Sequence, residues 1–301
     1  KKAARQSIGP ELEKRIQIII DTGLIELNDD FKIYWNNFPI AKLSVGNDYL
    51  NPNFELIIDD TIEQNPKQKL VDFIHKWIQT KINIVLKSLI DLKNLKEKNS
   101  SIKALAYQLY ENNGVLKREQ VSEYLKKLGQ NERKILRDLG VKFGRYHVFL
   151  YQLIKPEAVS LRTLLWKNFH QKYHKLKPPT FGLNFLNDQE SRNRNFMLLC
   201  GFEKFDNLFV RIDILERLFM QIINSNSKEN KEIKMVPEML NLLGCSKDNF
   251  KKLLKKMGYK VFDKEEETFF KYSPIKQFKK NPVKKVSGEN PFKILKNLNL
   301  G

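Results

Sequence analysis

The chain has 301 residues, enough for about two domains that each bury a hydrophobic core. Hydrophobic residues make up 41% of it, as in folded proteins, and no run approaches the ~18 apolar residues of a membrane helix, so we expect neither a disordered chain nor a membrane segment. The net charge of +19 favours polyanionic partners, although abundant Lys, Asn and Ile are equally typical of the compositional drift of an AT-rich genome.

The first 98 residues are predicted to form a helix, a β-meander and a long helix. Apolar residues on one face predict a helix over Pro10–Asp21, with Pro10 in its first turn. Turn residues at 28–30 and 36–37 divide the next segment into three short β-rich runs. A long apolar stripe then predicts a second helix over Pro66–Leu95.

A second unit, residues 99–178, is separated from the first by a boundary within the polar stretch Lys96–Ser101. Its pattern predicts three short helices and a β-rich run, which is the order of a winged helix: Ile102–Asn112, Arg118–Leu128, Asn131–Leu139 and Val141–Tyr151. Gly144 is expected to turn the hairpin by supplying a positive φ. In the helix that follows, we expect Leu161, Leu164, Leu165 and Trp166 to lie in the core.

The same order recurs in a third unit, residues 179–274, which starts at the helix-breaking pair Pro178–Pro179. Its predicted elements are three helices and two strands around an acidic turn: Ile212–Asn224, Pro237–Leu243, Lys247–Met257 and the run from Tyr259 to Tyr272. Residues 275–301 contain seven lysines and one glutamate and are interpreted as a flexible basic arm. The predicted fold is therefore mainly α with small β-hairpins, in helical accessory domains with winged-helix-like units.

No pattern of catalytic residues is found. The chain has no glycine-rich loop ending in Gly-Lys-Ser/Thr and no G-x-S-x-G motif. The acidic pair at 29–30 is assigned to a turn, and the pair at 59–60 to a helix N-cap. His170 and His174 have a zinc-like spacing but no third ligand nearby, so we expect no metal and no cofactor in this chain. Cys200 and Cys245 are far apart, which favours the reducing cytoplasm.

The candidate sites are positions for nucleic-acid binding. At the central hairpin they are Lys142, Arg145 and His147, although a hydrogen-bonded, partly buried role is favoured for His147. The late helix 247–257 is predicted to present its lysines outward, where a winged helix approaches nucleic acid; a solvated face is the alternative. These lysines are Lys251, Lys252, Lys255 and Lys256.

A second basic stretch, Lys155–Lys177, adds Lys155 and Arg162 to the candidates. Aromatic residues alternate with basic ones in this stretch, a pattern found where bases stack while cations hold phosphates. Trp166 is nevertheless expected to pack in the core, and the stretch is the weaker of the two basic signals.

The segment "LRDLGVKFGRYHVFLYQLIKPEAVSLRTLLW", Leu136–Trp166, resembles the region downstream of the motor in alphaproteobacterial helicase-related proteins, superfamily-two DExH enzymes of the Suv-three-like type. Three flanking stretches extend the resemblance over about residues 8–272: Tyr34–Leu56, Gly201–Leu218 and Met239–Tyr259. The resemblance implies helical accessory domains that help to enclose a single RNA strand. It carries over no catalytic residue, because the ATPase motifs of the family have no counterpart here.

We therefore expect the accessory, C-terminal region of an ATP-dependent RNA helicase, with ATP and Mg²⁺ bound only by the full-length enzyme. The expected partners are single-stranded RNA or DNA, upstream RecA-like motor domains of the same polypeptide, and a ribonuclease, with no membrane. Two alternatives stay open. A stand-alone winged-helix regulator would prefer one duplex sequence, whereas an interaction scaffold would keep its partner after its lysines are neutralised.

Overall fold

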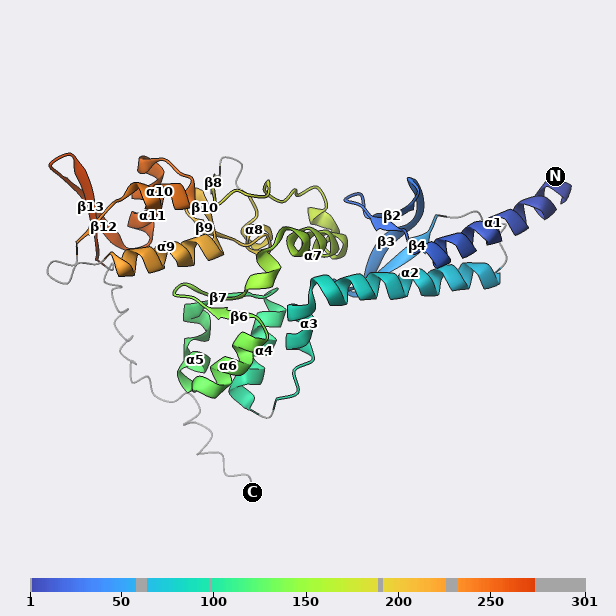
Figure 1. The fold of residues 1–301 in the computed structure, drawn as a ribbon, viewed down its shortest axis with the longest axis horizontal. Helices are drawn as coiled ribbons and strands as arrows, with labels where there is room; N and C mark the ends of the chain where they lie inside the picture. Colours follow the sequence, from blue (N-terminus) through green and yellow to red (C-terminus); the bar gives the residue numbers. More distant parts are fainter. Residues whose placement is uncertain (1, 58–63, 98, 189–191, 226–231, 274–301) are drawn as a thin grey trace, which may run out of the picture.

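A computed structural model describes residues 2–57, 64–97, 99–188, 192–225 and 232–273. The molecule is elongated, with the N-terminal helix at one end and the last β-hairpin at the other (Figure 1). It contains helices and four small antiparallel sheets, so the predicted class, mainly α with small β-hairpins, is confirmed. Within the described residues no helix is both long and apolar enough to cross a membrane. The predicted basic arm lies outside the described residues.

The N-terminal part is a helix followed by a four-stranded meander. Helix α1 (Lys2–Thr22) begins before the predicted Pro10, which lies inside it. The sheet has the order β1-β2-β3-β4, one strand more than predicted: β1 (Glu26–Leu27), β2 (Lys32–Trp35), β3 (Phe38–Asp48) and β4 (Asn51–Leu56). Both predicted turns are present, with positive φ at Phe31, Asn36 and Asn37. Asp59 and Asp60 lie outside the described residues.

The predicted long helix is two helices. Helix α2 (Gln64–Val85) packs beside α1 (Figure 1) and buries Leu70, Ile74, Ile78 and Ile82 along one stripe. The helix is interrupted at Leu86, where φ is −106° and ψ is 24°, and α3 (Lys87–Lys93) continues from there. Leu86 is fully buried, so the break turns the chain while the apolar stripe continues into the core.

The first winged-helix-like unit spans residues 100–150. Its elements are α4 (Ser100–Glu111), β5 (Val115–Lys117), η1 (Arg118–Val121), α5 (Ser122–Lys127), α6 (Gln130–Asp138), β6 (Val141–Phe143) and β7 (His147–Leu150). The Asn99 side chain caps α4 by accepting from the backbone N–H groups of Ser101 and Ile102. The sheet order β5-β7-β6 places the first strand beside the last, which the helix-and-hairpin order of a winged helix requires.

One buried helix connects the two ends of the molecule. After η2 (Tyr151–Ile154), helix α7 (Pro156–Phe169) contacts β3, α2 and α8, and η3 (Gln171–Tyr173) follows it. Every residue from 161 to 168 is buried, including the predicted core residues Leu161, Leu164, Leu165 and Trp166. The next elements are β8 (Phe185–Asn187), α8 (Arg194–Leu199), β9 (Phe202–Phe205) and β10 (Leu208–Arg211). The three strands form a small sheet of order β8-β10-β9.

The second winged-helix-like unit, residues 212–272, repeats the order of the first. Its elements are α9 (Ile212–Asn224), β11 (Ile233–Lys234), α10 (Pro237–Leu243), α11 (Lys247–Lys256), β12 (Tyr259–Lys264) and β13 (Glu267–Tyr272), with the sheet order β11-β13-β12. Ser246 caps α11 by accepting from the N–H of Asn249, as expected for an N-cap serine. Phe250, Leu253 and Leu254 are fully buried against Phe270 and its neighbours.

Candidate nucleic-acid interface

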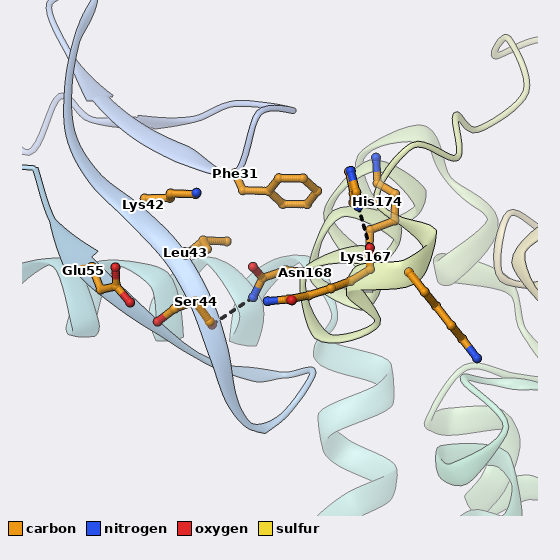
Figure 2. Close-up of a pocket in the computed structure, with 10 residues that line it drawn as sticks. Phe31, Lys42, Leu43, Ser44, Glu55, Lys167, Asn168 and His174 are labelled. Atoms are coloured by element: carbon orange, nitrogen blue, oxygen red, sulfur yellow. Dashed lines mark hydrogen bonds between the residues drawn. The ribbon is translucent and has the colours of Figure 1, made fainter.

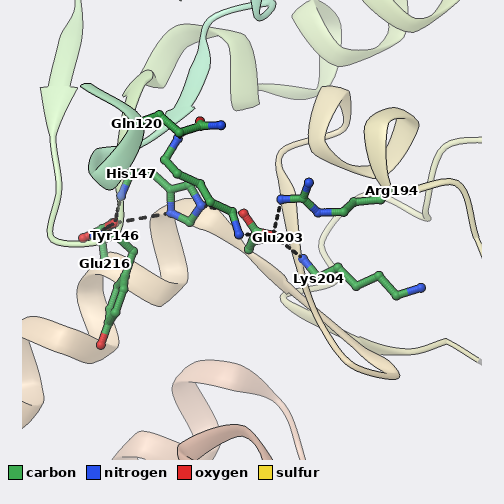
Figure 3. Close-up of polar contacts among 8 residues, drawn as sticks. Gln120, Tyr146, His147, Arg194, Glu203, Lys204 and Glu216 are labelled. Atoms are coloured by element: carbon green, nitrogen blue, oxygen red, sulfur yellow. Dashed lines mark hydrogen bonds and ion pairs between the residues drawn. The ribbon is translucent and has the colours of Figure 1, made fainter. Parts of the chain in front are cut away.

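The tip of the β6–β7 hairpin is held by one carboxylate from the second winged-helix-like unit. Glu216 on α9 accepts hydrogen bonds from the backbone N–H groups of Arg145, Tyr146 and His147, at 2.5, 2.9 and 2.9 Å. Figure 3 shows Glu216 beside Tyr146 and His147. Three N–H donors converging on one carboxylate satisfy most of its acceptor capacity. The hairpin tip is therefore fixed to α9 through backbone groups, and the Arg145 side chain remains exposed.

Gly144 has a different role from the one predicted. Its φ is not among the positive values of the chain, so the expected left-handed turn is wrong. A Cβ at this position would lie 2.3 Å from the Glu216 carboxyl carbon and 2.5 Å from both carboxylate oxygens. Any other residue at this position would therefore force the Glu216 carboxylate to shift, because the carboxylate approaches the backbone from the side on which a Cβ lies.

Below the tip, His147 and Glu203 form a buried pair. The His147 Nε2 atom lies 2.8 Å from a Glu203 carboxylate oxygen, and both side chains are 2% exposed. Burial lowers the pKa of His147, but the hydrogen bond with Glu203 and the negative charges of Glu203 and Glu216 outweigh it and leave the pKa above its ordinary value. The pair therefore joins β7 to β9 through a buried hydrogen bond.

Cations surround Glu203 from two further elements. Arg194 on α8 donates to the same carboxylate at 3.0 Å (Figure 3). The Lys117 ammonium lies 3.6 Å from this carboxylate. Burial alone would raise the pKa of Glu203, yet the hydrogen bonds from His147 and Arg194 lower it to about 2. Glu203 therefore stays ionised and ties the first unit to β9 and α8.

Beside this joint, a groove runs between the hairpin and α9. It has a volume of about 820 Å³, and we call it the hairpin groove. Its walls carry five cations: Arg118, Lys142, Arg145, Arg211 and Arg217. Aromatic and apolar side chains lie between them: Phe143, Phe149, Tyr151, Phe219 and Met220. Tyr151 and Met220 are 43% and 54% exposed, so part of the apolar lining faces solvent.

Most cations of the hairpin groove are not neutralised by a neighbouring acid. Arg211 is paired with Asp213 through two contacts of 2.7 and 3.0 Å. Among the described residues, the other four form no ion pair with a carboxylate within 4.0 Å, although Glu216 also lines the groove. Arg118 donates to the Gly144 carbonyl oxygen, and Arg145 lies over the Phe219 ring. The groove therefore presents excess positive charge next to flat apolar surfaces.

The structure brings together several of the predicted contacts. Lys142 and Arg145 both line the hairpin groove. Arg145 also lines an adjoining cavity of about 490 Å³, whose wall includes Lys256 from α11. Lys256 forms an ion pair with Asp206 at 3.1 Å, and Lys251 one with Asp263 at 2.9 Å. Lys252, Lys255 and Lys155 are exposed but do not line the hairpin groove.

Two predicted contacts are corrected, because the structure buries them. The buried His147 side chain contacts the carboxylates of Glu203 and Glu216. Arg162 is 0% exposed, and its guanidinium donates to the backbone oxygens of Asn113, Leu153 and Leu199. Neither side chain is accessible to a nucleic-acid strand, and both act as ties between segments instead.

Three cations of the hairpin groove were missed as site residues: Arg118, Arg211 and Arg217. Arg118 was placed only within a predicted helix, and it begins η1. The sequence of α9 held a signal for Arg217 as a site residue. The apolar Met220 lies close to Arg217 in the sequence and is exposed, whereas the exposed face of a helix typically carries polar residues.

The described residues offer little for other chemistry. Among them, no group of three or more His, Cys, Asp or Glu side chains is placed to hold a metal ion. His170 packs against Trp166, with 4.5 Å between ring centroids. Cys200 and Cys245 are free thiols, and burial raises their pKa values to about 12 and about 11, respectively. Their thiolates are therefore disfavoured near neutral pH.

Comparison with protein-family models, with curated proteins and with solved structures gives no match to this chain. A proposal for the function therefore rests on the geometry of the hairpin groove and on the sequence resemblance.

Proposed function

We propose that the chain is the nucleic-acid-binding accessory region of an ATP-dependent superfamily-two RNA helicase, where it guides single-stranded nucleic acid. The observation that carries the proposal is the hairpin groove, in which four cations without a carboxylate partner in the described structure lie among aromatic side chains. Cations neutralise phosphates, while aromatic rings stack with bases of any sequence. This combination suits a strand whose bases are unpaired.

The way the groove is built also supports a guiding role. One wall is the β6–β7 hairpin of the first winged-helix-like unit, and the other is α9 of the second. Glu216 holds the hairpin to α9, and the His147–Glu203 pair joins the hairpin strand β7 to β9. A groove whose walls are fixed by buried contacts binds a flexible strand without first having to order itself.

The motor chemistry is assigned to other domains. Because the sequence lacks a phosphate-binding glycine-rich loop, ATP and Mg²⁺ are proposed to bind the upstream RecA-like domains that the resemblance implies. A ribonuclease is the further proposed partner. The proposed location is the cytoplasm, where the free thiols of Cys200 and Cys245 would stay reduced.

A salt titration with paired variants tests the proposal. Anisotropy of labelled single-stranded RNA, single-stranded DNA and duplex would be measured for the wild type and for Lys142→Ala/Arg217→Ala. Each lost phosphate contact should lower the slope of log K against log salt by about 0.7 for a single strand, so the double variant should lose about 1.4. Binding should weaken similarly for all single-stranded sequences.

The matched control is Lys76→Ala/Lys103→Ala, which removes the same charge from exposed positions on α2 and α4, away from the groove. We expect the control to retain nearly the full slope and affinity. Equal losses in the two double variants would mean that only net charge matters, and the groove would not be the binding site.

A second candidate function has one observation in its favour. In α11, the third helix of the second winged-helix-like unit, Lys252 and Lys255 are exposed, as in a helix that enters a DNA groove. A duplex-reading regulator would bind one duplex sequence preferentially and lose affinity in Lys252→Ala/Lys255→Ala. The duplex arm of the titration separates this outcome from single-strand guiding.

A further inference from the structure

A separate pocket lies between the N-terminal meander and the end of α7, away from the hairpin groove. It has a volume of about 620 Å³, within the range of sites for small organic ligands. Figure 2 shows Phe31 projecting from the β1–β2 turn region toward the end of α7, with β3 along one side. The pocket also lies outside the segments that build the His147–Glu203 joint.

Lys167 is the unusual residue of this pocket. It is 6% exposed, so the side chain is almost entirely removed from bulk water. Its ammonium lies 5.6 Å from the centroid of the Phe31 ring. In the described part of the chain it has no carboxylate within ion-pair distance and no hydrogen-bond acceptor. The ammonium itself borders the pocket, since it is not among the fully buried polar atoms without a partner, and a ligand anion bound there would supply an opposite charge.

The surroundings of Lys167 favour the same kind of ligand. Burial lowers the pKa of Lys167, and the more distant Asp29 offsets this only in part. Lys42 from β3 and Lys172 from η3 also line the pocket, against a single acid, Glu55. The net charge of the lining is therefore positive at the place where the buried ammonium lies.

The pocket also offers a flat apolar surface and a rigid frame. The Phe31 ring forms part of its wall beside Leu43. The Phe31 carbonyl oxygen accepts from the Leu43 N–H at 2.8 Å, which fixes the turn against β3. The Asn168 side-chain amide donates to the Ser44 carbonyl oxygen at 3.0 Å, as the dashed line in Figure 2 shows, and joins α7 to the same strand.

From this arrangement we propose that the Lys167 pocket binds a phosphate ester of nucleotide size, with its phosphate at Lys167 and Lys42 and its base against Phe31. A base stacked on Phe31 would occupy the ring face over which the ammonium now lies, so the Lys167 side chain would move aside and contact the phosphate instead. The site does not depend on the proposed function, because it shares no residue with the hairpin groove.

Titration calorimetry with AMP, adenosine and inorganic phosphate tests the assignment on the full chain. We expect AMP to bind more tightly than either of its parts and Lys167→Met to weaken AMP binding at least tenfold. Lys103→Met on α4 is the matched control and should leave AMP binding unchanged. Failure of AMP to bind, or equal binding by Lys167→Met and Lys103→Met, would overturn the proposal.

Phe31→Leu tests the stacking half of the proposal. It should weaken AMP severalfold and leave inorganic phosphate binding unchanged. If inorganic phosphate binds the wild type as tightly as AMP does, the assignment of the base to Phe31 is wrong. A hexamer of adenosine without a terminal phosphate identifies the source: binding that depends on Lys167 indicates a nucleotide within a strand, whereas binding of AMP alone indicates a free nucleotide.

A stability measurement separates loss of the site from loss of the fold. Without ligand, the Tm of Lys167→Met should equal or exceed that of the wild type, because the substitution removes an unpaired buried charge. With AMP present, the Tm of the wild type should rise and that of Lys167→Met should not. A lower Tm of Lys167→Met without ligand would show that the lysine serves the fold, and the proposal would fail.

Discussion

Substituting Gly144 tests how the two winged-helix-like units are joined. The three heavy atoms nearest to an added Cβ all belong to the Glu216 carboxylate, at 2.3 to 2.5 Å. The backbone of Gly144 is not in the left-handed region, so alanine fits its φ. Gly144→Ala therefore perturbs one contact, the approach of Glu216 to the hairpin tip.

The size of the effect follows from that contact. The carboxylate must retreat by about 1 Å to reach ordinary van der Waals separation. Its hydrogen bonds from the N–H groups of Arg145, Tyr146 and His147, now 2.5 to 2.9 Å long, would then be lost or weakened. Such bonds contribute about 1.5–3 kcal/mol each, and water replaces part of them at the exposed tip. We expect a loss of about 3 kcal/mol, roughly a 100-fold change in the local opening equilibrium.

Amide hydrogen exchange measures this opening at the residues concerned. The amides of residues 145–147 should exchange about 100-fold faster in Gly144→Ala than in the wild type. In a Glu216→Ala background the glycine substitution should add little, because the obstructing carboxylate is gone. Unchanged exchange rates, or an equal effect in both backgrounds, would refute the explanation of Gly144.

Two further predictions concern the buried ties. Arg162→Met leaves three backbone oxygens without their donor, and we expect it to cost about 3 kcal/mol and lower the Tm by several degrees; an unchanged Tm would contradict the role of Arg162. The pKa of His147 is raised above 6.5, so its stabilisation is complete below that pH and lost as the pH rises through the folded-state pKa. The Tm difference between the wild type and His147→Gln should therefore shrink from pH 6 to pH 9, and a constant difference would show that His147 is not charged in the fold.

The sequence predicts best those elements whose residues carry a local pattern. Helices α9 and α10 begin and end where predicted, because an apolar period defines the first and Pro237 starts the second. The lysine-rich α11 was predicted to within one residue. The predicted winged-helix order rests on these helices and on the hairpin that follows them.

The elements and roles that were missed depend on contacts distant in sequence. Strands β5, β8 and β11 have two or three residues each and are defined by their pairing, not by a pattern of their own. The partner of His147 is 56 positions away, and Arg162 reaches 37 positions to Leu199. The space at Gly144 is set by a glutamate from another unit. No local pattern contains such information.

Helix α7 sets limits on how this chain can be divided. Since residues 161–168 are buried on every side, the helix belongs to the core of the N-terminal meander and to that of the following elements at the same time. A fragment that ends before α7, or starts after it, would expose apolar surface that normally contacts the helix. Biochemical dissection of the chain should therefore keep α7 together with the elements on both of its sides, and insertions are better tolerated in surface turns than near this helix.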